Sequence, residues 1–154
     1  MSSDEPADCP SPAHRRPPGT SDADVDAAAK LSGALEIVER ARGHLYAFHH
    51  LTGRADGRLD TALDSLREAG HDALAEQVAT ELLGRNVLAG RWTFQIVEEY
   101  DDDYYATFRA LEKQVRDQLT DGRRHIAEAE MKESRRTHGH DAHRATPSTA
   151  AEES

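Results

Sequence analysis

Histidine and glutamate residues at helical spacing form the first candidate site, one for a metal ion. Glu68 and His71 make a Glu-x-x-His pair, which places two ligands on one inward helix face in di-iron helical bundles. His44 lies among apolar residues and could add a nitrogen ligand, and Glu98 could add oxygens. Such a site uses two of these pairs and two further glutamates, so the full set is missing. We therefore expect no resident metal and keep these four residues as candidates, with a core-edge role for His44 as the alternative.

The loop before the expected third helix carries a second candidate site, one for an anion. Residues 84–92 begin with a glycine, contain another near their end, and lead into a helix that we expect to start at Thr93. Guanidinium groups beside the free N–H groups of a helix N-terminus attract phosphate or carboxylate. The residues that would form this site are Arg85, Asn86, Arg91 and Trp92. In the alternative interpretation, the arginines pair with acids and the tryptophan closes the end of a bundle; the candidate acids are Glu81, Glu98 and Glu99.

No residue pattern indicates a catalytic site. The chain has one cysteine, Cys9, in a proline-rich segment, and contains no Gly-x-Ser-x-Gly motif, phosphate loop or dinucleotide fingerprint. Residues 98–103 are carboxylates except for Tyr100, and we interpret them as a solvated helix face or as a receptor for arginines. We expect no catalytic residue and no cofactor, which favours a non-enzymatic protein over an enzyme.

The charge of the chain limits its partners. It has 154 residues with 19 Lys and Arg against 29 Asp and Glu, which gives a formal net charge of −10. Because phosphates would be repelled, we expect neither nucleic acid nor an anionic membrane as a partner. The sequence has no signal-peptide pattern and no apolar run of about 18 residues, so we expect a cytoplasmic protein.

Apolar residues recur at steps of three and four through the middle of the chain, which is the spacing of one helix face. The first expected helix begins near Thr20–Asp22 and ends at Thr52–Gly53. Its apolar stripe runs from Leu31 to Phe48. A second row widens this stripe and consists of Ile37, Ala41, His44, Phe48 and Leu51.

Glycines decide how many further helices there are. The second helical region spans about 54–83, and Gly70 either breaks it or lies inside a continuous helix; we favour the break. The third helix begins at Thr93 or just before it and either continues to about Arg136 or breaks at Gly122.

Both ends of the chain are poor in large apolar side chains, and residues 1–20 hold five of the six prolines. Such segments cannot bury enough surface to offset the entropy cost of ordering. We therefore expect a disordered N-terminal tail at 1–20, a helical bundle domain at 21–136 and a disordered C-terminal tail at 137–154.

These elements predict an all-α protein: an up-down antiparallel helical bundle of three long helices, or four if Gly70 breaks the second. A long third helix would leave Val115 and Leu119 partly uncovered, and uncovered apolar surface marks interfaces. We expect a non-enzymatic protein–protein interaction module that self-associates as a homodimer or binds another protein. The alternative is a metal- or small-ligand-binding bundle, or an enzyme, with a site built from His44, Glu68, His71 and Glu98.

Overall fold

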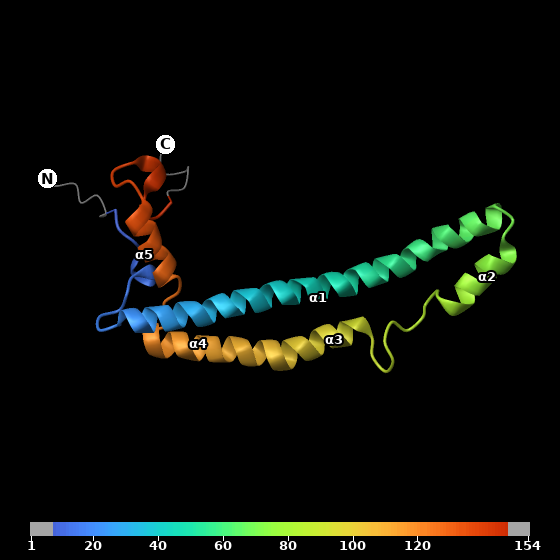
Figure 1. The fold of residues 1–154 in the computed structure, drawn as a ribbon, viewed down its shortest axis with the longest axis horizontal. Coiled ribbons are helices and arrows are strands. Elements are labelled where there is room, and N and C mark those ends of the chain that lie inside the picture. The colour runs from blue at the N-terminus through green and yellow to red at the C-terminus, as the bar shows by residue number, and fades with distance from the viewer. Residues whose placement is uncertain (1–7, 148–154) are drawn as a thin grey trace. The chain divides into compact units, whose positions relative to one another are not determined.

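The computed structural model describes residues 8–147, and every regular element in this range is helical. The elements are η1 (Pro12–His14), α1 (Asp22–Glu68), α2 (Asp72–Glu81), α3 (Thr93–Tyr100), η2 (Asp101–Tyr105), α4 (Ala106–Thr120), α5 (Ile126–Arg135) and η3 (Asp141–His143) (Figure 1). An isolated antiparallel bridge joins Leu88 and Arg91 in the loop before α3. The predicted all-α class is therefore confirmed for the described residues.

Helix α1 is longer than predicted, and the expected end at Thr52–Gly53 is wrong. The helix continues through both residues to Glu68. The Thr52 hydroxyl donates a hydrogen bond to the Phe48 carbonyl at 2.7 Å, so its side chain is satisfied inside the helix. A glycine within a helix costs only about 1 kcal/mol relative to alanine, and Gly53 does not overcome the intact turns on both sides.

The predicted break at Gly70 is confirmed. Gly70 takes a left-handed φ of +84°, a conformation that glycine adopts without the steric cost of a side chain. Its N–H donates to the Arg67 carbonyl at 2.9 Å, and the His71 N–H donates to the Leu66 carbonyl at 2.9 Å. These two bonds are those of a Schellman cap, so α1 ends at Glu68 and α2 begins after His71.

The third helical region begins at Thr93, as predicted, and it is interrupted twice. The turn η2 has π-helical hydrogen bonding and separates α3 from α4. The chain then breaks after Thr120, where Asp121 and Gly122 have φ values of 54° and 72°. Of the two alternatives for this region, the break at Gly122 is therefore the one observed, and α5 is a separate helix.

The structure divides into two compact units, which we describe separately. The central unit is Glu36–Thr107, and the terminal unit combines Met1–Leu35 with Phe108–Ser154. Helices α1 and α4 each contribute residues to both units.

The predicted tails lie partly outside the described range, at residues 1–7 and 148–154. Within the described part of the terminal unit, Arg16 donates two hydrogen bonds of 2.9 Å to Glu130, and Arg136 donates two of 2.7 Å to Asp8, one to its carboxylate and one to its carbonyl. The disorder of the tails and the domain limits at 21–136 stay predictions.

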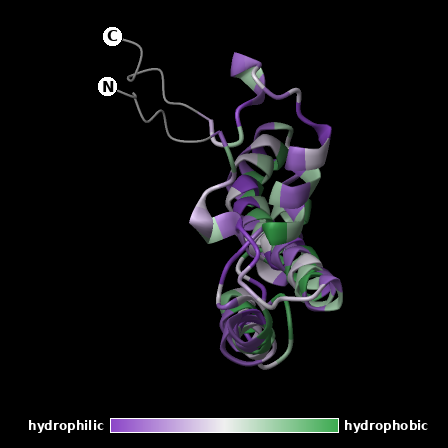
Figure 2. Ribbon diagram, turned by 90° about the vertical axis from the view of Figure 1, so that its left-hand side faces the viewer, coloured by the Kyte–Doolittle hydropathy of each residue, from purple (hydrophilic) through white to green (hydrophobic). Residues whose placement is uncertain are grey.

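The core of the central unit is thin. Its buried apolar residues are Val38, Leu63, Ala75 and Val97. Hydrophobic and hydrophilic residues are interspersed along the helices (Figure 2). Large apolar side chains with substantial exposure outnumber the buried ones in this unit; they are Ile37, Tyr46, Phe48, Leu51, Leu74, Leu82, Leu83, Val87, Leu88, Trp92, Phe94 and Tyr104. A two-helix arrangement leaves much of the apolar surface uncovered, because each helix has only one neighbour to pack against.

The terminal unit contains a buried ion pair on α4. Arg116 Nε donates to Glu112 Oε1 at 3.1 Å, and the Ser32 hydroxyl donates to the same carboxylate at 2.9 Å. A second nitrogen of Arg116 donates to the Gly122 carbonyl at 3.0 Å, which satisfies the backbone just beyond the end of α4. Burial raises the pKa of Glu112, but the hydrogen bonds from Arg116 and Ser32 lower it more, so the net pKa lies below its ordinary value.

Candidate functional site

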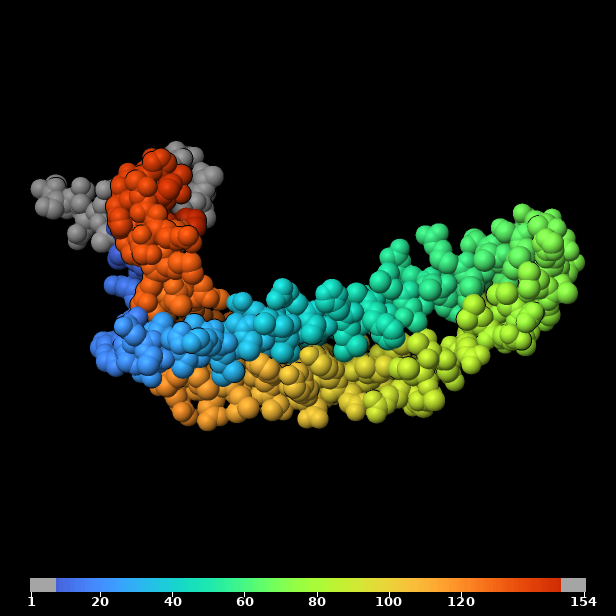
Figure 3. All heavy atoms as spheres, viewed as in Figure 1, coloured from blue at the N-terminus to red at the C-terminus, as the bar shows by residue number. Residues whose placement is uncertain are grey.

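In the central unit, α1 packs antiparallel against α3 and η2. His49 Nδ1 lies 2.7 Å from the Thr93 hydroxyl, Arg42 binds Asp101, and the Tyr105 hydroxyl donates to Glu39 at 2.6 Å. The residue numbers of the α1 partners fall as those of the α3 and η2 partners rise, which is the pattern of antiparallel packing. The atoms of the two segments lie against each other in the space-filling view (Figure 3). The result is a layer of two helices whose register is set by polar contacts.

Arg42 is the main polar link in this layer. Its Nε and Nη2 donate to the two carboxylate oxygens of Asp101 at 2.6 and 2.9 Å, a bidentate geometry that suits the planar guanidinium. The guanidinium carbon also lies 4.9 Å from the ring centre of Tyr46 and 5.1 Å from that of Tyr105. The hydrogen bonds from Arg42 lower the pKa of Asp101, so this carboxylate stays ionised and occupied.

One face of α1 in the central unit is apolar and uncovered. The face toward α3 and η2 is buried or half-buried; it consists of Val38, Arg42, Leu45, His49 and Thr52. The residues that directly precede Val38, Arg42, Leu45 and His49 are all exposed. They form the start of a second row, which continues toward the C-terminus of α1 with the same alternation of steps. We name this row the outer stripe; it consists of Ile37, Ala41, His44, Phe48, Leu51 and Ala55. Its steps alternate strictly between four and three residues, which is the heptad spacing of a coiled-coil seam.

The structure does not gather the four metal candidates into one site. His44 is exposed on the outer stripe, and Glu98 is exposed on α3. Glu68 ends α1 and His71 precedes α2, with the left-handed Gly70 between them, so the Glu-x-x-His pair does not lie on one helix face. Within residues 8–147, no group of three or more His, Cys, Asp or Glu side chains is placed to hold a metal ion.

The anion candidates are already occupied or point into solvent. Arg91 donates to Glu99 at 2.5 Å, and Arg85 donates to the backbone carbonyl of Glu81 at 3.3 Å. The Trp92 backbone N–H donates to the Gln95 side chain at 2.9 Å, which caps the start of α3. Asn86 is exposed, and Trp92 is 64 % exposed, so it does not close the end of a bundle as the alternative interpretation had it. The predicted pairing of Arg91 with Glu99 is confirmed, whereas Arg85 bonds to a carbonyl instead of a carboxylate.

The acidic run at 98–103 receives arginines of its own chain. Glu99 binds Arg91 and Asp101 binds Arg42, while Glu98, Asp102 and Asp103 are exposed. Part of the run is thus an internal receptor for arginine, and the rest is a solvated helix face.

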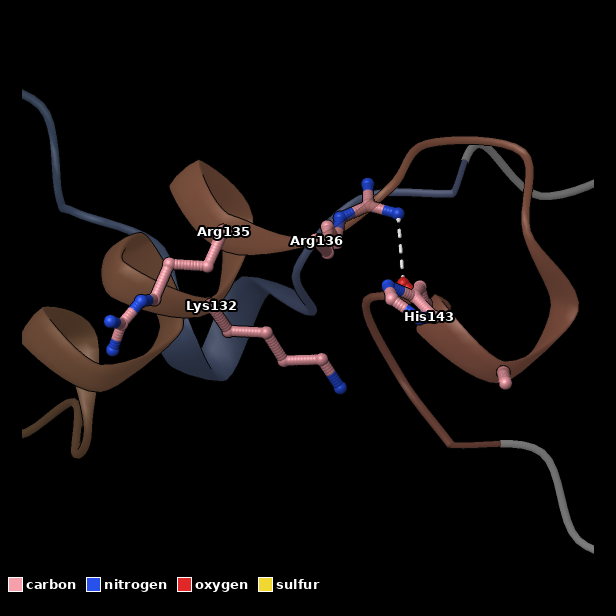
Figure 4. Close-up of a pocket in the computed structure, with 5 residues that line it drawn as sticks. Lys132, Arg135, Arg136 and His143 are labelled. Carbon is pink, nitrogen blue, oxygen red and sulfur yellow. Dashed lines mark hydrogen bonds between the residues drawn. The ribbon is translucent and has the colours of Figure 1, made fainter.

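A shallow hollow of about 350 Å³ lies in the terminal unit (Figure 4). It is lined by Lys132, Arg135, Arg136, Ala142 and His143. The Arg136 side chain is only 2 % exposed and its guanidinium is taken by Glu133, by Asp8 and by the His143 carbonyl at 3.3 Å. Arg135 points away from His143 in the close-up view. These cations therefore do not converge on a ligand, and Arg136 joins segments of the chain to one another.

The contacts around Arg136 make the carboxyl group of Glu133 unusually acidic. Hydrogen bonds from Arg136 and His138 lower the pKa of Glu133 from 4.5 to about 2. The contact of Glu133 with Arg136 and His138 stabilises the fold fully above pH 4.5, the ordinary pKa of a glutamate. This stabilisation is lost as the pH falls through the lowered pKa of about 2. We expect the Glu133 carboxyl carbon to titrate near that lower value by NMR. Arg136→Gln should return the midpoint toward 4.5, whereas Arg135→Gln should leave it unchanged; equal midpoints in all three proteins would contradict the assignment.

Three features were missed by sequence reasoning. The bidentate contact of Arg42 and the cluster around Arg136 join residues that are far apart in the chain. The spacing of residues along the sequence therefore does not predict them. The outer stripe was visible as a second apolar row, and its alternating four-three spacing was a signal for a separate packing seam. Its exposure was not predicted, because periodicity marks a face without saying what covers it.

Comparison with known proteins gives no match to a family model, to a curated protein or to a solved structure. Among residues 8–147, no helix combines the length and the apolar character that a membrane span requires. The geometry of the central unit is therefore the basis for a functional inference.

Proposed function

We propose that this protein is a non-enzymatic interaction module that self-associates through the outer stripe. The observation that carries the proposal is the exposure of a heptad-spaced row on α1, from Ile37 to Ala55, which is apolar at every position except His44. Ile37 is 60 % exposed, Phe48 43 % and Leu51 56 %. A row of this kind gains its hydrophobic stabilisation only when another helix covers it.

The scarcity of carboxylates near the outer stripe supports a second copy of this chain as the partner that covers it. The chain as a whole carries a net charge of −10, which disfavours association through most of its surface. Between Ile37 and Ala55 there is one carboxylate, Glu39, and it faces η2 through its bond with Tyr105. The outer stripe itself is therefore free of acids, so two copies can approach there without bringing carboxylates together.

Self-association would also supply the predicted bundle. The central unit provides a layer of two antiparallel helical segments, α1 against α3 with η2. When the apolar faces of two such layers meet, four helical segments surround one apolar core. We propose this arrangement between copies in place of the three- or four-helix bundle expected within one chain. It uses α1, and not Val115 and Leu119 of α4, because those two are half-buried.

The oligomeric state tests this proposal. Sedimentation equilibrium of the native protein, from micromolar to hundreds of micromolar, should show the mean mass rising toward twice the 17.0 kDa of one chain. A mass of 17.0 kDa at every concentration would overturn the proposal.

A further inference from the structure

We infer that the second copy lies antiparallel along α1, with Phe48 of one copy opposite His44 of the other. This inference rests on the proposed self-association and specifies its register. The outer stripe has steps of four, three, four, three and four residues, which read the same in both directions. A reversed copy can therefore meet all six positions, with Ile37 opposite Ala55, Ala41 opposite Leu51 and His44 opposite Phe48.

Side-chain size favours this antiparallel register over a parallel one. In the antiparallel pairing, each alanine of the stripe meets a large aliphatic residue, and the phenylalanine meets the smaller imidazole ring. A parallel pairing in register would place Ala41 on Ala41 and Ala55 on Ala55, which leaves two voids, and would crowd Phe48 against Phe48. Interiors pack at near-crystalline density, and both voids and overpacking are destabilising.

The uncovered area is that of a modest dimer. A side chain of this size presents roughly 150 Å², so the exposed halves of Ile37, Phe48 and Leu51 offer roughly 75 Å² each. Ala41, His44 and Ala55 between them bring the face to roughly 400 Å² per copy, about half of the 800 Å² in standard interfaces. The area suits a dimer that forms and separates with concentration.

One charge contact provides a directional test of the register. Arg40 and Arg54 flank the stripe on the side away from α3, and the antiparallel register places Arg40 of one copy near Arg54 of the other. The repulsion between these two arginines weakens the dimer, and a single substitution can turn it into an attraction. Arg54→Glu should tighten the dimer, because each copy then presents a carboxylate to the Arg40 guanidinium of its neighbour. A parallel pairing would bring Arg54 beside the apolar flank of α1, and the substitution would not tighten it.

Engineered disulfides test the register directly. In a Cys9→Ser background, which removes the exposed native thiol, we compare Ala41→Cys, Leu51→Cys and the double variant. Only the double variant places a thiol opposite a thiol, and it should form a covalent dimer at least ten times faster under mild oxidation. Ile37→Cys with Ala55→Cys provides a second pair with the same logic.

The outcomes separate the two proposals. A background variant that remains monomeric by light scattering overturns self-association and the register with it. A dimer in which Ala41→Cys alone cross-links as fast as the double variant overturns the antiparallel register and leaves self-association standing. A dimer in which only the paired thiols cross-link supports both.

Discussion

Leu51→Asp should convert the protein into a monomer at concentrations where the native chain is dimeric. Leu51 is 56 % exposed in the single chain and, in the proposed dimer, lies opposite Ala41 of the other copy. The substitution removes an apolar contact and places an unpaired carboxylate in the interface, twice per symmetric dimer. Burying an unpaired polar group costs about 1–3 kcal/mol, so the dissociation constant should rise at least about 100-fold. Sedimentation equilibrium of the variant and the native protein measures the change.

Gly53→Asp is the matched control. It adds the same charge to the same helix, on the side opposite the outer stripe, where no atom beyond the adjacent residues and the surrounding helix backbone lies within 4 Å of an added Cβ. This variant should keep the native dissociation constant to within a few-fold. Circular dichroism of both variants should show native helicity, so that a change in mass reports association. A native mass profile for Leu51→Asp would exclude the outer stripe as the interface.

The helical elements were largely predictable, because their ends depend on local chemistry. Gly70 and Gly122 both take left-handed φ values, which glycine adopts without steric cost. A glycine is visible in the sequence, so such a helix end can be predicted from it. Thr93 follows a glycine-containing loop and starts a helix whose third residue, Gln95, caps the backbone of Trp92. Gly53 misled the prediction since a glycine is only a weak helix breaker when the φ it adopts stays helical.

The candidate site was not predictable in the same way, because it depends on which helices become neighbours. The apolar row from Ile37 to Ala55 was visible, but a buried stripe and an exposed stripe have the same spacing. Arg42 and Asp101 are too far apart in the chain for spacing to connect them. The Glu-x-x-His pair failed for a local reason, since Gly70 lies between its two members and ends the helix that would have aligned them.

Removing Arg116 should destabilise the terminal unit more than any surface substitution. Arg116 and Glu112 both have side chains that are only 10 % exposed, so Arg116→Ala leaves a largely buried carboxylate without its cation and the Gly122 carbonyl without a donor. Breaking one partner of a buried pair costs about 3 kcal/mol. Urea denaturation followed by circular dichroism at neutral pH should show a loss of this order. Lys113→Ala removes a solvent-exposed ion pair with Asp117 on the same helix and should cost far less than Arg116→Ala.

The pH dependence of this loss identifies its cause. In the native protein the pKa of Glu112 is lowered, so the pair stabilises the fold above the ordinary carboxyl value of 4.5 and loses this effect as the pH falls. Without Arg116, the Ser32 hydrogen bond and the charge of Arg124 remain to oppose burial, so the pKa of Glu112 rises from its native value and less stability is gained as the pH rises. The deficit of Arg116→Ala should therefore be larger at pH 7 than at pH 4. In a Glu112→Gln background the same substitution should cost less and show no such dependence. A deficit that is equal at both pH values would mean that lost packing of the arginine stem, and not an unpaired carboxylate, sets the cost.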